Sequence, residues 1–129
     1  MLHSLLLISA GAALGAVCRW SLGLWLNGIF SAWNVGTLAA NLIGCFIIGC
    51  LMGVFWQYAN VSESWKLFLV TGFLGALTTF SSFSAEVIEL LLKGDWAIGL
   101  GVLCLHLFGS LFCTLLGIFC FRLVIPDSQ

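Results

Sequence analysis

The fold of this chain depends on one polar stretch inside a long apolar segment: Thr78-Thr79-Phe80-Ser81-Ser82-Phe83-Ser84. The stretch interleaves five hydroxyl side chains with two phenylalanines, and Gly72 and Gly75 lie just upstream. Polar groups in hydrocarbon must find partners or line a water-filled path. The glycines and the threonine pair therefore predict a helix that breaks near the middle of the membrane. A kinked helix that tolerates its glycines is the simpler alternative.

The composition places the chain in a lipid bilayer. Of its 129 residues, 62% are hydrophobic and 7% are charged. A soluble domain of this size could not hide so much apolar surface, because small domains leave much of their surface exposed to water. The net charge of −1 provides no basic patch, so we expect no nucleic-acid partner. The six cysteines lie in apolar runs without a C-x-x-C pair, which favours buried hydrophobic side chains over metal ligands.

Four segments are long and apolar enough to cross a membrane, which takes about 20 residues per helix. They are expected at residues 2–26, 33–57, 65–92 and 96–124. The connections at 27–32, 58–64 and 93–95 carry the turn formers and much of the charge. Residues 1–129 are thus expected to form a single all-α integral membrane domain. Too little mass remains outside the membrane for an enzyme active site, so we expect no enzymatic activity.

Lys and Arg are balanced across the membrane. Four spans put both termini on one side together with Lys66 and Arg122, while Arg19 and Lys93 lie on the other. Because the Lys and Arg bias sets orientation, a balance of two against two predicts insertion both ways. Two opposed copies could then pair as an antiparallel homodimer. If Arg19 lies too deep to count, a weak bias remains instead.

Polar side chains recur at helical spacing on two further spans. Thr37 and Asn41 lie one turn apart on the second span. His106, Ser110 and Thr114 form a stripe on the fourth span. A lone hydroxyl often bonds its own helix backbone, but an amide cannot satisfy all its groups in that way, and a clamp between helices is its simpler role. With the hydroxyls of the opening stretch, the stripes predict a narrow track of donors suited to an anion.

Two phenylalanines and a histidine border this predicted track. Phe80 and Phe83 are three residues apart and share a helix face. An aromatic ring has a positive edge, so edges turned to the track could contact a small anion. Ordinary core packing is the other interpretation of these rings. His106 fits a neutral hydrogen-bonding residue better than a proton carrier.

Two charged residues lie deep in their spans. Arg19 either extends to the interface or raises the local anion concentration at a vestibule. Glu86 lies deeper than Glu89, and its burial requires a partner or water. Carbonyls freed by the break in the third span could bind a cation, as in discontinuous transporter helices.

Three motifs resemble the Fluc (CrcB) family of fluoride channels, and the resemblance covers essentially the whole chain. They are Gly11-Ala12-Ala13-Leu14-Gly15-Ala16-Val17-Cys18-Arg19-Trp20, Gly36-Thr37-Leu38-Ala39-Ala40-Asn41-Leu42-Ile43-Gly44, and the most specific one, Gly72-Phe73-Leu74-Gly75-Ala76-Leu77-Thr78-Thr79-Phe80-Ser81-Ser82-Phe83-Ser84. The resemblance implies a fluoride-selective channel that exports fluoride passively. It also implies a dual-topology antiparallel homodimer with two pores in the bacterial cytoplasmic (inner) membrane.

The resemblance implies roles for single residues as well. Phe80 and Phe83 would line the pores by their ring edges, and Asn41 would donate to fluoride. We place six more residues along the pore: Ser81, Ser84, Thr37, Ser110, Thr114 and His106.

Arg19 matches the vestibule arginine of the family, and we group Glu86 with it as an electrostatic residue. The resemblance implies a structural sodium ion on the dimer axis, held by the backbone carbonyls of Gly75 and Thr78 from both subunits. The chain departs from the family pattern at Ser82, where Thr is common, and at His106, where some members have Tyr.

Two other function classes fit the size of the chain. A small four-helix, proton-coupled cation or multidrug antiporter needs a membrane-embedded carboxylate early in the chain, and no Asp or Glu precedes Glu63. A membrane assembly protein without transport would not need three stripes of donors. The expected partners are therefore fluoride, membrane lipid and a second copy of this chain.

Overall fold

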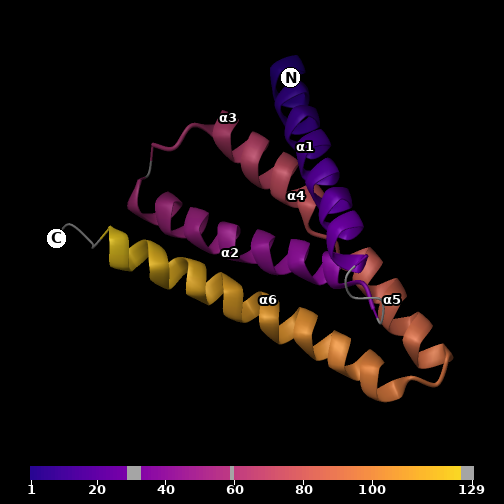
Figure 1. The fold of residues 1–129 in the computed structure, drawn as a ribbon. Helices are drawn as coiled ribbons and strands as arrows, with labels where there is room; N and C mark the ends of the chain where they lie inside the picture. The colour runs from indigo at the N-terminus through magenta and orange to yellow at the C-terminus, as the bar shows by residue number, and fades with distance from the viewer. Residues whose placement is uncertain (29–32, 59, 126–129) are drawn as a thin grey trace.

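The computed structural model describes residues 1–28, 33–58 and 60–125, and every regular element in this part of the chain is helical. The elements are α1 (Leu2–Asn27), α2 (Val35–Gln57), α3 (Glu63–Lys66), η1 (Leu67–Leu74), α4 (Gly75–Leu77), α5 (Phe80–Leu92) and α6 (Trp96–Val124). All except η1, a π-helix, are α-helices, and α3 to α5 together form the third span (Figure 1).

The predicted fold class is confirmed, because four helical segments are long and apolar enough to cross a membrane. The second span begins later than expected, at Val35, and the third earlier, at Glu63. Part of the expected connection at 27–32, namely residues 29–32, lies outside the described residues. The chain is therefore a multi-pass membrane protein.

The burial pattern fits a lipid surrounding. In α1, the only buried residues are Gly11 and Gly15, whereas large apolar side chains such as Trp25 are mostly exposed. Helix α6 similarly turns Phe108 and Phe112 outward, each 64% exposed. Helices suit this environment, because they satisfy their backbone hydrogen bonds within the segment.

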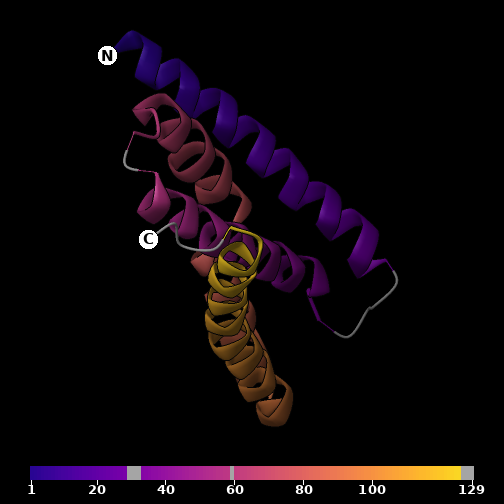
Figure 2. The same cartoon turned by 90° about the vertical axis from the view of Figure 1, so that its left-hand side faces the viewer.

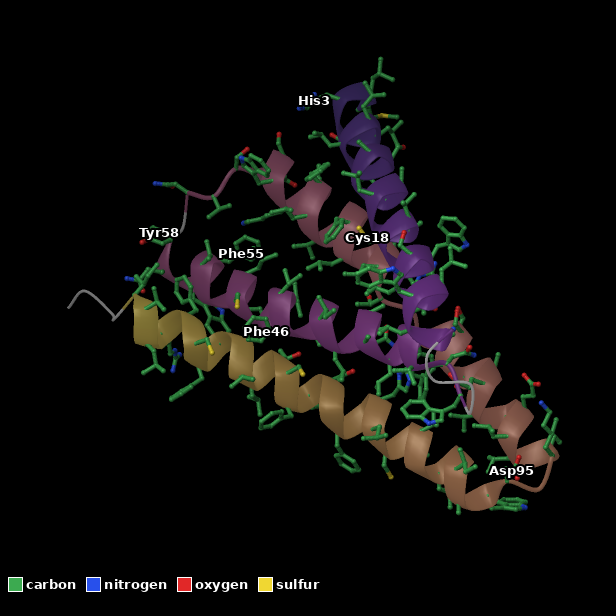
Figure 3. All side chains as sticks on the ribbon, in the orientation of Figure 1. His3, Cys18, Phe46, Phe55, Tyr58 and Asp95 are labelled. Atoms are coloured by element: carbon green, nitrogen blue, oxygen red, sulfur yellow. The ribbon has the colours of Figure 1, made fainter. Side chains whose placement is uncertain are left out.

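Helix α2 lies at the centre of the fold. It packs against α6 along much of its length and against α1 on another side. Figure 2 shows α1 at the outer edge, with the α3–η1–α4 segment beneath its N-terminal part and the start of α2 near its C-terminal part. Figure 3 places Tyr58 at one end of the α2–α6 pair and Asp95 at the other.

Glycines bring the helix backbones into close contact within this single chain. A Cβ atom on Gly11 or Gly15 would overlap backbone atoms of η1, and one on Gly49 would overlap the Thr114 carbonyl of α6. These glycines therefore pack helices of one subunit against one another. Gly101 differs, because a Cβ there would meet no atom within 4 Å among the described residues.

The third span is broken at its middle, as the sequence predicted. Helix α4 ends at Leu77, and α5 begins at Phe80. Between them, Thr78 has φ −85° and ψ 152°, and Thr79 has φ −150° and ψ 124°, which is extended backbone. Gly75 keeps helical dihedral angles, so the threonines carry the break. The half before the break packs on α1, and the half after it packs on α6.

Candidate functional site

Asn41 holds the break in the third span. Its Oδ1 accepts a hydrogen bond from the Thr79 backbone N–H at 2.8 Å, and its Nδ2 donates to the Thr79 carbonyl at 3.0 Å. The Thr79 N–H has lost its helical acceptor, the Gly75 carbonyl, whereas the Thr79 carbonyl, at the N-cap of α5, also accepts the first bond of that helix. Asn41 is only 8% exposed. The clamp between helices, one of the two roles considered for this amide, is thus present in the structure.

His106 is the second partner of the Asn41 amide. Its Nδ1 lies 3.0 Å from Asn41 Nδ2. Since an amide nitrogen only donates, Nδ1 must accept, and the neutral ring then carries its proton on Nε2. His106 is 3% exposed, and Nε2 is buried with no hydrogen-bond partner among the described residues. This nitrogen is therefore an unused buried donor.

The aromatic residues extend the cluster outward from His106. The His106 ring stacks on Phe83, with centroids 4.6 Å apart and an interplanar angle of 20°. Phe83 and Phe80 meet edge to face, at 5.2 Å and 77°. Phe83 is 7% exposed, whereas Phe80 is 78% exposed. Phe83 is thus covered by His106 on one face and packs with Val87 and Val102 in a small core cluster.

These side chains border one cavity of about 480 Å³. It contains five of the residues predicted along the pore: Asn41, Phe80, Phe83, His106 and Ser110. Thr78, Thr79, exposed leucines of α6 and Cys45 form the rest of its wall, and no pattern in the sequence had singled out Cys45. The structure therefore joins the polar residues of three spans at one place.

Other residues predicted along the pore lie elsewhere. Thr37 lines a second cavity of about 650 Å³ together with Arg19, although it shares a helix face with Asn41. The Thr114 hydroxyl donates to the Ser110 carbonyl at 3.0 Å. Ser84 is half-buried on α5 and lines neither of these two cavities.

The hydroxyl groups after the break form a cap on α5. Thr79 Oγ1 accepts a hydrogen bond from the Ser82 backbone N–H at 3.2 Å. The same oxygen lies 3.2 Å from Ser81 Oγ and donates to Ser82 Oγ at 3.1 Å. A threonine that precedes an apolar helix by one residue is a frequent cap. That signal was present in the sequence and could have identified Thr79.

Arg19 bonds the other side of the break. Its Nε donates to the Ala76 carbonyl at 3.0 Å, at the C-terminal end of the first half-helix. A cation stabilises this end, where unpaired carbonyls give partial negative charge. Arg19 also lines the second cavity, and its guanidinium lies next to the break.

Two carbonyls at the break are released from the helix ladder. In a continuous helix, Gly75 and Thr78 would accept from the N–H groups of Thr79 and Ser82. Those N–H groups instead donate to Asn41 Oδ1 and Thr79 Oγ1. Backbone carbonyls at an unwound helix are suitable ligands for a hard cation. In the described part of the chain, no three His, Cys, Asp or Glu side chains converge on a metal site.

Glu86 connects α5 to the start of α2. Its Oε1 accepts a hydrogen bond from the Asn34 backbone N–H at 2.6 Å, while its buried Oε2 has no partner among the described residues. Asn27 bridges the same corner, because its Nδ2 donates to Asn34 Oδ1 at 3.2 Å and its Oδ1 accepts from Gly36 N at 2.9 Å. The partner required by the buried carboxylate is thus the backbone at the N-terminus of α2.

Comparisons with known proteins agree on one family. The family model described as CrcB-like protein, Camphor Resistance (CrcB), matches residues 6–118. A protein of Haemophilus influenzae (strain PittGG), named fluoride-specific ion channel FluC, is 55% identical over 122 residues, which are 95% of either chain. Relatives with the same name from Mannheimia succiniciproducens and Pasteurella multocida are 57% identical, over 92% and 93% of this chain and 93% and 94% of their own. These relatives are named as ion channels, and not as antiporters or enzymes.

Proposed function

This chain belongs to the CrcB-like family, and we propose that it is a fluoride-selective channel through which fluoride leaves the cell passively. Relatives more than half identical over nine-tenths of the chain carry that name. The observation in the structure that supports the proposal most is the cluster of Asn41, His106, Phe83 and Phe80 around one cavity.

The cluster offers hydrogen-bond donors without a fixed charge. His106 Nε2–H is buried and free to donate among the described residues. Asn41 Nδ2 can exchange the bond that it makes to His106 Nδ1 for one to an anion. Fluoride is small and strongly hydrated, so its passage requires donors that replace lost water. The positive edges of Phe80 and Phe83 can contact the anion between such donors.

The second cavity, which opens one helical turn before Asn41 on α2, would be the vestibule. Arg19 and Thr37 line it, and the Arg19 charge raises the local concentration of anions. From there, an anion would pass Asn41 and reach the aromatic cluster. An inside-negative membrane potential drives an anion outward through an open path, so export needs no coupled ion.

We further propose that the working unit is an antiparallel homodimer in the bacterial inner membrane, with one pore on each side. The balance of Lys and Arg supports insertion both ways. The exposure of Phe80 supports pairing, since 78% of this predicted pore residue is uncovered in one chain. A second chain would complete the wall of the 480 Å³ cavity.

The same proposal includes a structural sodium ion held by the carbonyls of Gly75 and Thr78. The release of both carbonyls from the helix ladder supports this assignment. Sodium would neutralise the partial negative charge that these oxygens bring to the break.

The proposal is tested with purified protein in liposomes loaded with potassium fluoride. A potassium ionophore should start fluoride release, which a fluoride electrode detects in the outer solution. The same liposomes loaded with chloride should release far less anion. No fluoride release, or equal release of chloride, would contradict the function. Protein-free liposomes serve as the control for leakage.

The dimer proposal has a test of its own. A reporter fused to the C-terminus should be detected on both sides of the membrane in comparable amounts. Signal from one side alone would contradict dual topology without affecting the fluoride result.

A further inference from the structure

The peptide between Thr78 and Thr79 connects two sites of the proposed channel. Its N–H end donates to Asn41 Oδ1 at 2.8 Å, and its C=O end is a carbonyl proposed to bind sodium. A trans peptide is planar, and its C=O and N–H point in opposite directions. The Thr78 carbonyl therefore points away from Asn41. The direction of this carbonyl depends on how the Thr78 side chain packs against α2.

Gly44 on α2 leaves the space in which the Thr78 side chain packs. It is buried on α2, three residues after Asn41, so the two lie on one helix face. A Cβ atom on Gly44 would overlap the Thr78 methyl group, Cγ2. The next atoms, Leu77 Cδ2 and Thr78 Cβ, lie at ordinary contact distances of 3.7 and 3.8 Å. One methyl group thus occupies the space that a side chain at Gly44 would need.

The Thr78 side chain cannot rotate away freely. Its hydroxyl donates to the Leu74 carbonyl at 2.9 Å, which fixes the rotamer and hence the direction of the methyl group. A larger residue at Gly44 must therefore break this bond or displace the Thr78 backbone. Because Asn41 holds the far end of the same rigid peptide, displacement of Thr78 rotates its carbonyl.

We propose that Gly44 is a positioning residue for the sodium site. Because Gly44 has no side chain, Thr78 packs against α2 in the orientation that turns the Thr78 carbonyl toward the cation. Gly44 itself contacts no ion and acts through the Thr78 methyl group. This inference rests on the sodium ion of the proposed function.

The experiment compares Gly44→Ala in two backgrounds, wild type and Thr78→Ser. Serine keeps the hydroxyl and the carbonyl but lacks Cγ2. The first readout is the sodium midpoint of thermal stabilisation of the purified dimer, with N-methylglucamine replacing sodium at constant ionic strength. The second is the sodium midpoint of fluoride release from liposomes. In the wild-type background, Gly44→Ala should raise both midpoints about tenfold, which corresponds to about 1.4 kcal/mol.

In the Thr78→Ser background, the same substitution should change the midpoints by less than about twofold, well under 1 kcal/mol. Gly53→Ala is the matched control, because a Cβ there would also overlap one side chain, that of Phe121 on α6, far from the break. It should lower the melting temperature and leave the sodium midpoint unchanged.

Equal sodium midpoints for wild type and Gly44→Ala would overturn the role of Gly44. An equally large effect in the Thr78→Ser background would do the same, because the methyl group would not be the cause. If Gly44→Ala fails to fold in the wild-type background, the comparison between Thr78→Ser and the double variant decides, and failure to fold there also overturns the proposal. Wild-type protein without any sodium dependence would remove the sodium site, whereas wild-type protein without fluoride release would remove the channel function.

Discussion

The two halves of the third span are held to the rest of the chain by different means. The half before the break lies on α1 through backbone contacts that glycines permit, such as those of Gly11 and Gly15 on η1. The half after the break is held by side-chain hydrogen bonds, because Asn41 is hydrogen-bonded to the Thr79 backbone and Glu86 to the Asn34 backbone. Close backbone packing dominates the first contact, to which one hydrogen bond from Arg19 to the Ala76 carbonyl adds, and side-chain hydrogen bonds mark the second.

We therefore expect the two contacts to matter for different properties: the glycine contact for folding and the polar contact for fluoride conduction. Substitutions at the glycine contact should prevent the helices from meeting, so they should reduce the amount of folded protein. Substitutions at the polar contact should leave the helices in place and alter the path of the ion.

The largest effect should come from filling the glycine contact. Gly15→Leu would place a side chain into the Phe73 carbonyl, a backbone atom that cannot move aside. Overpacking costs about 1–3 kcal/mol or more in well-packed cores, so little folded protein should elute on gel filtration. Gly101→Leu is the control, because no described atom lies within 4 Å of a Cβ there. Equal yields of the two variants would show that the α1–η1 contact is not specific.

Asn41→Asp should give the next largest effect, on flux and not on folding. The carboxylate can still accept from Thr79 N–H but loses the donors to the Thr79 carbonyl and His106. The variant replaces an amide donor by a negative charge, which repels an anion at short range, so fluoride release should fall about tenfold or more. Release is measured with the fluoride electrode, and gel filtration checks the dimer. Ile43→Val, on the exposed side of α2, serves as the control. Normal flux with Asp in place would remove the pore role of Asn41.

Phe80→Ile should reduce flux by a smaller amount. An aromatic contact contributes about 0.5–1.5 kcal/mol beyond burial, so fluoride release should fall about two- to tenfold. The ring is 78% exposed in one chain, so its loss should not unfold that chain. Phe108→Ile changes a 64% exposed ring on α6 and should leave flux unchanged. Similar rates for both variants would contradict a special role of Phe80.

The smallest effect is expected where α5 ends. Lys93 Nζ lies 2.6 Å from Glu89 Oε1, and both side chains are more than half exposed. This hydrogen bond raises the pKa of Lys93, so any stabilisation is present below its unfolded pKa and lost as pH rises through the raised pKa. Exposed pairs contribute little. Lys93→Ala should therefore melt at the wild-type temperature near neutral pH. A clearly lower melting temperature would contradict this expectation and show that the ion pair at the end of α5 contributes to stability.

The four spans and the break could be predicted from the sequence, because both depend on local composition. The partners of the polar residues could not. Thr37 and Asn41 share a helix face, yet α1 covers one and α6 the other, so they open onto different cavities. Helical periodicity indicates which residues share a face, and it contains no information on which helix that face meets.

The same limit applies to the aromatic pair and to His106. Phe80 and Phe83 have equivalent positions in the sequence pattern, but one is exposed and the other is stacked on His106. The proton position on His106 follows only from its contact with Asn41, on a helix far away in the sequence. Such assignments require tertiary contacts.

The π-helix η1 affects the angle, measured about the helix axis, between the contact with α1 and the contact with Asn41. Its hydrogen bonds span five residues instead of four, so each residue advances the helix by a smaller angle than in an α-helix. Gly72 faces α1 within η1, and the Thr78–Thr79 peptide faces α2 a few residues later. The wide turn thus sets the rotation between these two directions.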